Sequence, residues 1–189
     1  MKSSDLPIVL SRLRKAAKNW RIPVVAEISY QLDPFAVLVS CLLSLRTRDD
    51  LTKVAFEKLF NLASTPQKIL QLDPEIIANA IYPVAFYRNK TASLYEICRT
   101  LINDYEGKVP ESLSELLKLK GVGRKTANLT LVLGYGKPGI CVDTHVHRIS
   151  NRWGYVKTKS PDETEMVLRR KLPKRYWMEY NDLLVSFGQ

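Results

Sequence analysis

Cysteine and histidine are scarce in this sequence. Among 189 residues there are three cysteines, Cys41, Cys98 and Cys141, which lie far apart in apolar surroundings. An odd and widely spaced set provides neither a disulfide framework nor metal-ligand spacing, so we expect buried thiols of an intracellular protein. The two histidines, His145 and His147, are two positions apart. Because such residues do not share a helix face, we expect no metal site built from them.

Long apolar runs are missing as well. The longest, Phe35 to Leu45, is too short to span a bilayer. The start of the chain lacks the charged region of a secretory signal, so we expect no targeting segment. There is no internal repeat, low-complexity segment or flexible linker. These absences predict a protein that has no membrane partner and acts in the cytoplasm.

Acidic residues are outnumbered by basic ones. The chain has 29 Lys and Arg against 19 Asp and Glu, a formal net charge of +10 and a pI near 9.6. This balance favours a polyanionic partner, although a basic protein without such a partner has the same composition. Apolar residues make up 46% of the chain, which is enough for a substantial core. A chain of this length forms one compact unit or two small lobes.

Helical signals recur, whereas the period-2 alternation of strands is nearly absent. Four helix starts place a capping residue before a proline, at Asp33-Pro34, Thr65-Pro66, Asp73-Pro74 and Ser160-Pro161. We therefore predict an all-α protein. Asp49 or Asp50 is expected to cap a further helix. The helices are expected at about 6–18, 34–45, 50–60, 66–72, 74–81 and 90–105, as a hairpin pair within about 112–135, and at about 143–153, 160–171 and 173–187.

The segment from Leu119 to Asn128 carries the strongest functional signal. Its sequence, Leu-Lys-Gly-Val-Gly-Arg-Lys-Thr-Ala-Asn, places two glycines between two apolar helical patterns. The glycines favour a tight hairpin that presents backbone N–H groups to an anion at the start of the second helix. An ordinary helix–helix turn has the same glycines. Lys120, Arg124 and Lys125 favour the anion site, because a cation at this end of a helix needs an anionic partner or shifts toward its neutral form.

A second motif, Val142-Asp143-Thr144-His145, follows this segment. Asp143 lies eighteen positions after Lys125. With this spacing, the two motifs resemble those of the helix–hairpin–helix DNA repair glycosylases, and most closely the endonuclease III branch. The resemblance implies a six-helix barrel at 27–137, with the helix–hairpin–helix motif at about 112–135. It also implies a second helical lobe from 1–26 and 138–189, with Lys125 and Asp143 facing one cleft.

The resemblance implies that Lys125 is the nucleophile of a glycosylase with AP lyase activity in base excision repair. Its amine would attack C1′ of a damaged nucleotide, expel the base, form a Schiff base and nick the strand by β-elimination. The helix N-terminus, Arg124 and Lys120 should favour the neutral amine. Asp143 would stabilise the cationic sugar and assist proton transfer. The alternatives are a phosphate-binding role for Lys125 and simple helix capping for Asp143.

The resemblance also implies DNA contacts along the hairpin. Backbone amides of Val122, Gly123 and Arg124 would hold a phosphate, with Lys120 and Gly121 in the same turn. His145 would lie near the cleft, and His147 is expected to be a polar residue beside it. Backbone carbonyls of Leu117, Leu119 and Val122 match positions that bind an alkali ion in relatives.

Two loops match the wedges with which this family fills the gap left by a flipped base. In Leu45-Arg46-Thr47, Arg46 replaces the usual glutamine. In the loop with Phe86 and Tyr87, Ala85 replaces the usual preceding glycine. These departures leave open which residue fills the gap and which base is preferred. Alternatively, Phe86 and Tyr87 pack into the core at a helix start.

Most of the family continues past a Phe-Gly-Gln like 187–189 into four cysteines that hold an iron–sulfur cluster, whereas this sequence stops there. Cluster ligands need close cysteine spacing, so we expect no cofactor in this chain. Either the sequence is truncated before the cluster region, or the protein is a member of the family without the cluster. We expect a monomer that removes oxidised pyrimidines from damaged duplex DNA. The alternatives are an oxidised-purine glycosylase with the same catalytic pair and a non-catalytic DNA-binding module.

Overall fold

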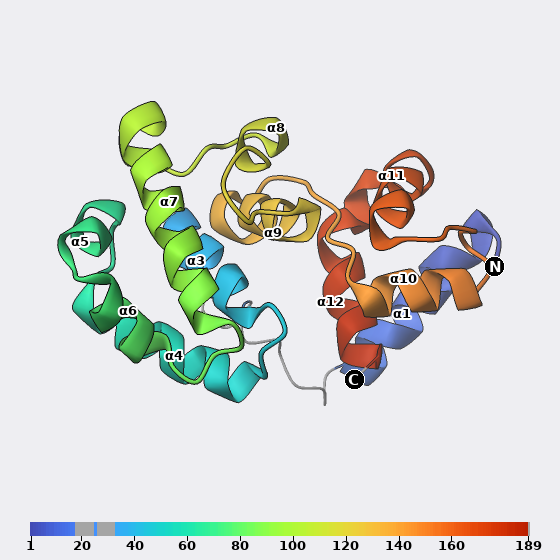
Figure 1. Ribbon diagram of the computed structural model, residues 1–189. Helices are drawn as coiled ribbons and strands as arrows, with labels where there is room; N and C mark the ends of the chain where they lie inside the picture. Colours follow the sequence, from blue (N-terminus) through green and yellow to red (C-terminus); the bar gives the residue numbers. More distant parts are fainter. Residues whose placement is uncertain (18–24, 26–32, 189) are drawn as a thin grey trace. The chain divides into compact units, whose positions relative to one another are not determined.

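The computed structural model describes residues 1–17, 25 and 33–188 (Figure 1). Within these residues all regular secondary structure is helical, as the sequence predicts. The chain divides into two compact units, one of Val24–Lys137 and one that combines Met1–Pro23 with Pro138–Gln189. None of the helices in the described part of the chain is long and apolar enough to cross a membrane.

Each unit has its own set of helices. The central unit, 24–137, contains α3 (Pro34–Ser44), α4 (Asp49–Leu62), α5 (Pro66–Gln71), α6 (Pro74–Ile81), α7 (Tyr87–Tyr105), α8 (Leu113–Leu116), α9 (Arg124–Leu129) and the π-helical η3 (Thr130–Gly134). The terminal unit contains η1 (Ser3–Asp5), α1 (Leu6–Ala17), α10 (Thr144–Arg152), α11 (Pro161–Lys171), η4 (Lys174–Tyr176) and α12 (Trp177–Gly188).

The predicted helix starts form as local chemistry dictates. The Asp33 carboxylate accepts the Phe35 N–H at 3.0 Å, and the Asp73 carboxylate accepts the Glu75 N–H at 2.8 Å. Thr65 and Ser160 cap α5 and α11 in the same way. A proline occupies the first turn of all four helices. Each cap contributes about 1 kcal/mol, so these starts are set by short stretches of sequence.

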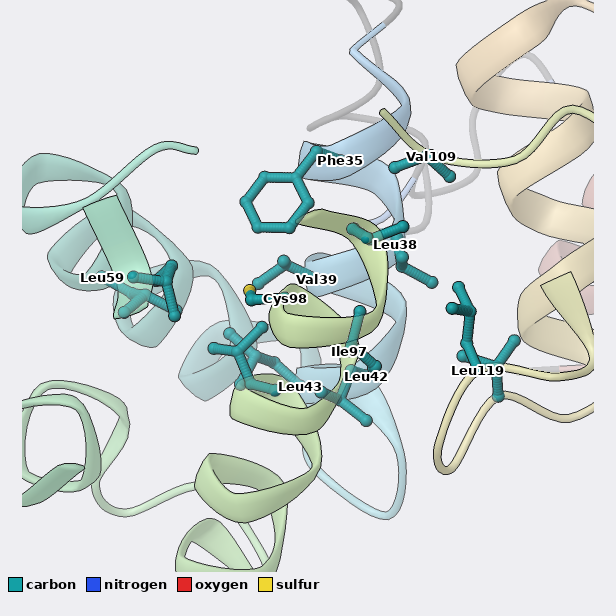
Figure 2. Close-up of a cluster of buried hydrophobic side chains, with 14 of the residues drawn as sticks. Phe35, Leu38, Val39, Leu42, Leu43, Leu59, Ile97, Cys98, Val109 and Leu119 are labelled. Atoms are coloured by element: carbon teal, nitrogen blue, oxygen red, sulfur yellow. The ribbon is translucent and has the colours of Figure 1, made fainter. Parts of the chain in front are cut away.

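Helix α3 is the centre of the central unit. Its side chains are buried without interruption from Phe35 to Leu43, and it packs against α4, α7, α9 and η3. Figure 2 shows side chains of α3 and α7 packed together, with Leu42 beside Ile97 and Phe35 above Val39 and Cys98. A helix that is apolar on every side must be surrounded by other helices, which explains the central place of α3 in this unit.

The terminal unit has a core of its own. Helices α1, α10 and α12 pack together around the fully buried Tyr155 and Tyr180. The Tyr180 hydroxyl lies 3.0 Å from the Ser150 hydroxyl, so its polar end is hydrogen-bonded inside the core. The Met1 amino group donates to the Trp153 carbonyl at 2.7 Å, which ties the first residue to the end of α10.

Some predicted boundaries are wrong. Arg48, with extended backbone, is the N-cap of α4, so neither Asp49 nor Asp50 caps the helix. Both aspartates lie in the first turn, where the helix dipole stabilises acidic side chains. Helix α7 begins at Tyr87 rather than at about Lys90. The first helix of the hairpin pair has only the four residues of α8.

Candidate functional site

The glycine segment forms a tight hairpin between α8 and α9. The Val122 N–H donates to the Leu119 carbonyl at 3.1 Å and closes the turn. Gly121 has φ +75°, a left-handed conformation that other residues adopt only at a cost. The Val122 side chain is 7% exposed and joins the core of the central unit. The buried Val122 therefore fixes the turn to the core, while the two glycines of the turn are exposed.

Gly123 has a different role from Gly121. It is the N-cap of α9, and its φ of −92° is open to any residue. A Cβ built on Gly123 would meet no described atom within 4 Å. No side chain of the described residues caps α9 either. The free protein therefore does not need glycine here, whereas a large anion approaching the backbone N–H groups would need the open space.

Three cations surround this helix start. Lys120 and Lys125 are exposed, and Arg124 is half-buried. Helix α9 packs against α3, and Lys125 is close enough to the thiol of Cys41 to act on it. Burial raises the pKa of Cys41 to about 12, against the opposing charge of Lys125. Positive side chains at the positive end of a helix add to the positive potential there, which suits an anion.

Asp143 and His145 lie in the terminal unit, at the start of α10. The Asp143 Oδ1 atom accepts the Val146 N–H at 2.8 Å, so Asp143 does cap this helix. The cap uses one carboxylate oxygen, so it is compatible with a chemical role for the carboxylate. The His145 Nδ1 atom lies 3.2 Å from the Arg148 guanidinium. Since Lys125 belongs to the other unit, its pairing with Asp143 remains a prediction.

His147, the second histidine of α10, belongs to a polar cluster in the terminal unit. Its Nδ1 atom lies 2.7 Å from the Thr164 hydroxyl of α11 and 3.3 Å from the Asn151 amide. The Asn151 amide also donates to the Thr158 hydroxyl at 3.0 Å. These contacts give His147 a structural role in joining α10 to α11.

The two predicted wedge loops meet within the central unit. Arg46 and Phe86 both have left-handed backbone, with φ of 56° and 57°. The Arg46 guanidinium lies 5.8 Å from the centre of the Phe86 ring. Phe86 is 59% exposed, so core packing is excluded for this residue. Tyr87 is half-buried and does pack against the core, as the alternative interpretation held.

Lys90 hydrogen-bonds to the first of these loops and lies at the end of the second, a role that no sequence motif predicted. This lysine is 6% exposed, and its ammonium donates to the Leu43 carbonyl at 2.8 Å, the Leu45 carbonyl at 2.7 Å and the Thr47 hydroxyl at 3.2 Å. Burial lowers the pKa of Lys90 to about 8. The available signal was a lysine in the first turn of a helix, where a cation is unfavourable unless acceptors surround it.

The side chains of the described residues do not fit an iron–sulfur cluster. Such a cluster takes four closely spaced cysteines. The three buried thiols are on α3, on α7 and before α10, and no group of three potential metal ligands exists among the described residues. The hairpin carbonyls of Leu117, Leu119 and Val122 are hard oxygen donors that suit an alkali ion, and this site remains a prediction.

Comparison with known proteins gives consistent matches. Residues 39–174 match the family described as HhH-GPD superfamily base excision DNA repair protein. Endonuclease III of Thermotoga maritima is 50% identical over 159 residues, which cover 84% of this chain and 75% of that protein. Endonuclease III-like protein 1 of Mus musculus is 42% identical over 167 residues, which cover 87% of this chain and 56% of that protein.

A solved structure extends the similarity to three dimensions. It is that of a trapped endonuclease III–DNA covalent intermediate in an estranged-adenine complex. It matches with a TM-score of 0.88 at 32% identity, covering 100% of this chain and 86% of that chain. The similarity therefore includes the hairpin, both wedge loops and the start of α10.

Proposed function

The chain belongs to the endonuclease III branch of the HhH-GPD superfamily as a bifunctional DNA glycosylase and AP lyase, and we propose that it removes oxidised pyrimidines from duplex DNA. Its all-helical architecture is the helix–hairpin–helix glycosylase fold. The observation that carries the proposal is an exposed Lys125 on the first turn of α9, two positions after Gly123, in a chain 50% identical to a protein named endonuclease III.

Lys125 is proposed as the nucleophile. Its neutral amine forms a bond to C1′ while the glycosidic bond breaks, and the base leaves with the bonding electrons and takes up a proton. The sugar ring then opens to a Schiff base between Lys125 and C1′. Loss of a C2′ proton expels the 3′ phosphate and nicks the strand. A lysine suits both steps, because its amine is the nucleophile of the first and the imine that it forms accepts electrons in the second.

Asp143 is proposed to support the first of these steps. Positive charge develops on the sugar as the base leaves, and a fixed carboxylate stabilises that charge. The Val146 N–H holds Oδ1 of Asp143 in place, so the group is oriented before the substrate arrives. The same carboxylate can relay a proton between the attacking amine and the departing base.

DNA is held by the backbone at the hairpin and opened by the wedge loops. We propose that the N–H groups at the start of α9 bind one phosphate, because the open space at Gly123 and the charges of Lys120 and Arg124 suit it. Arg46 and Phe86 would fill the gap left by the flipped nucleotide, with Tyr87 supporting Phe86 and His145 contacting the strand. The proposed active form is a monomer acting inside the cell.

A panel of lesions tests the substrate. Duplexes with one thymine glycol, one 8-oxoguanine or one abasic site are followed under single-turnover conditions. We expect base release from thymine glycol to exceed that from 8-oxoguanine by at least about 100-fold, a difference that pocket contacts readily provide. Faster release of 8-oxoguanine would establish the purine alternative. A protein that binds all three duplexes and cuts none would be a DNA-binding module.

A further inference from the structure

Lys90 joins two segments of the central unit at one point. Its ammonium has three N–H donors, and three acceptors surround it: the carbonyls of Leu43 and Leu45 and the hydroxyl of Thr47. The two carbonyls lie at the carboxyl end of α3, where peptide oxygens lack helical partners and attract a cation. Lys90 itself lies in the first turn of α7. It therefore fixes the end of α3 to the start of α7.

Thr47 connects the two loops directly. Its Oγ1 atom accepts the Ala85 N–H at 3.2 Å and a Lys90 N–H at 3.2 Å, and it donates to the Leu45 carbonyl at 3.3 Å. The Thr47 N–H donates to the Ser44 carbonyl at 3.1 Å. One hydroxyl thus links the loop that carries Arg46 to the loop that carries Phe86. A methyl group in place of this hydroxyl would make none of the three bonds of Oγ1.

We call the hydrogen-bonded pair Lys90 and Thr47 the Lys90 hub. The side chains of Arg46 and Phe86, next to this hub, are exposed and in contact with each other. Arg46 and Phe86 both hold left-handed backbone, which non-glycine residues adopt only when the surrounding structure enforces it. The guanidinium of Arg46 lies against the face of the Phe86 ring. Both residues are next to backbone segments that Lys90 and Thr47 hold by hydrogen bonds, which favours one relative position of their side chains before any ligand binds.

We propose that Thr47 and Lys90 are positioning residues that join the two wedge loops, so that Arg46 and Phe86 enter the DNA gap as one preorganised unit. The inference rests on the proposed function, because it concerns how that function opens DNA. Preorganisation matters since loops ordered on binding would consume binding free energy that otherwise drives base flipping.

The test removes the Thr47 hydroxyl without removing its bulk. Thr47→Val keeps the shape of the side chain and leaves Lys90 its two carbonyl acceptors. Thr47→Ser restores the hydroxyl. Thr52→Val is the matched control, because the buried Thr52 hydroxyl donates within the start of α4, to the Arg48 carbonyl at 3.0 Å, and away from both wedge loops. Undamaged-duplex affinity and circular dichroism confirm that each variant binds DNA and folds.

Filling of the gap by the wedge is measured on a DNA duplex that undergoes no chemical step. The probe is a duplex with a tetrahydrofuran abasic analogue and 2-aminopurine opposite it, whose fluorescence rises when the wedge unstacks it. The wild-type protein, Thr47→Ser and Thr52→Val should raise the fluorescence, and Thr47→Val should lose most of the rise. Base release from thymine glycol should slow at least about tenfold in Thr47→Val, since the loss of even one hydrogen bond is worth about that factor, while cleavage of a preformed abasic site stays within about twofold.

A double-mutant cycle tests the coupling independently. If Arg46 and Phe86 act as one unit, the loss of base release in Arg46→Ala/Phe86→Ala should be at least about fivefold smaller than the product of the two single losses. In the Thr47→Val background the losses should multiply. Multiplicative losses in the wild-type background would overturn the proposal even if Thr47→Val does not fold.

An equal fluorescence rise in Thr47→Val and wild type, or no rise in wild type, would also overturn it. A wild-type protein that fills the gap yet releases no base and cuts no abasic site would refute the proposed function. That result would not contradict the proposed role of Thr47 and Lys90.

Discussion

The carboxylate of Asp143 caps a helix, and we propose that the same carboxylate also takes part in the chemistry of base release. Its Oδ1 atom caps α10, and asparagine is as good a cap as aspartate. Asp143→Asn should therefore leave the free energy of unfolding within about 1 kcal/mol. Base release should fall by about 10²-fold to 10⁴-fold, the usual loss when acid–base help is removed. Single-turnover kinetics on a thymine glycol duplex measure the fall.

An abasic duplex supplies the control for this substitution. It has no base to expel, so the Asp143→Asn defect should be smaller there than on thymine glycol. An equal loss on both duplexes would contradict the assigned role, because it would place Asp143 in the elimination step or in DNA binding.

Asp182 on α12 predicts a pH dependence of stability. Burial raises the pKa of this carboxyl from 3.8 to about 6. Between about pH 4 and pH 6 the folded protein therefore binds more protons than the unfolded chain, so stability from this group falls as pH rises through that window. At pH 7, Asp182→Asn should raise the free energy of unfolding by about 1 to 3 kcal/mol.

Urea titrations at pH 4 and pH 7 check this prediction. The gain from Asp182→Asn should vanish near pH 4, where the folded carboxyl is already neutral. Asp104→Asn, at an exposed aspartate, controls for the loss of one negative charge. A gain of the same size at both pH values would show that burial of the charge is not its cause.

The hairpin is an element in which two glycines make different demands. Gly121 needs its left-handed backbone, so Gly121→Ala should cost about 1 to 2 kcal/mol in the free energy of unfolding. Gly123 has ordinary backbone and open space, so Gly123→Ala should change stability by less than about 1 kcal/mol. Its new methyl group should still block a phosphate and lower DNA affinity at least about tenfold.

Urea denaturation and fluorescence anisotropy with an undamaged duplex separate the two effects. The hairpin assignment requires the order of the variants to reverse between the assays: Gly121→Ala is worse in stability and Gly123→Ala is worse in affinity at a temperature where both are folded. Unchanged DNA affinity in Gly123→Ala would contradict phosphate binding at α9.

Element boundaries show which features a sequence determines locally. Asp33, Thr65, Asp73 and Ser160 cap their helices as predicted, because a cap depends on residues within one turn. The start of α7 could not be predicted in this way. Phe86 takes its left-handed conformation only in the folded loop, where the Ala85 N–H reaches Thr47 from a distant part of the chain.

The candidate site shows the same contrast. The hairpin and the Asp143 cap follow from short motifs, since glycines, cations and a cap residue act on their own neighbours. The Lys90 hub depends on contacts between residues more than forty positions apart, which periodicity does not reveal. The all-helical class was predictable from residue pattern alone, whereas the role of each site residue came from family resemblance.

For the molecule as a whole, the net charge of +10 predicts electrostatic DNA binding. Each neutralised phosphate releases counterion, so log K for undamaged duplex should fall linearly with log salt, with a slope of about −0.9 per phosphate contact. Anisotropy titrations between about 50 and 200 mM salt measure this slope. A flat plot would contradict backbone-dominated binding, and a strong dependence on sequence would contradict recognition through phosphates.

The central claim is that the amine of Lys125 attacks the sugar of the damaged nucleotide. Reduction with borohydride during turnover on a thymine glycol duplex converts a Schiff base into a stable protein–DNA adduct. Wild type and Lys120→Gln, which removes the exposed lysine on the other side of the hairpin, should both give the adduct. Lys125→Gln should bind the duplex and give none, whereas an adduct in Lys125→Gln would mean that another amine is the nucleophile.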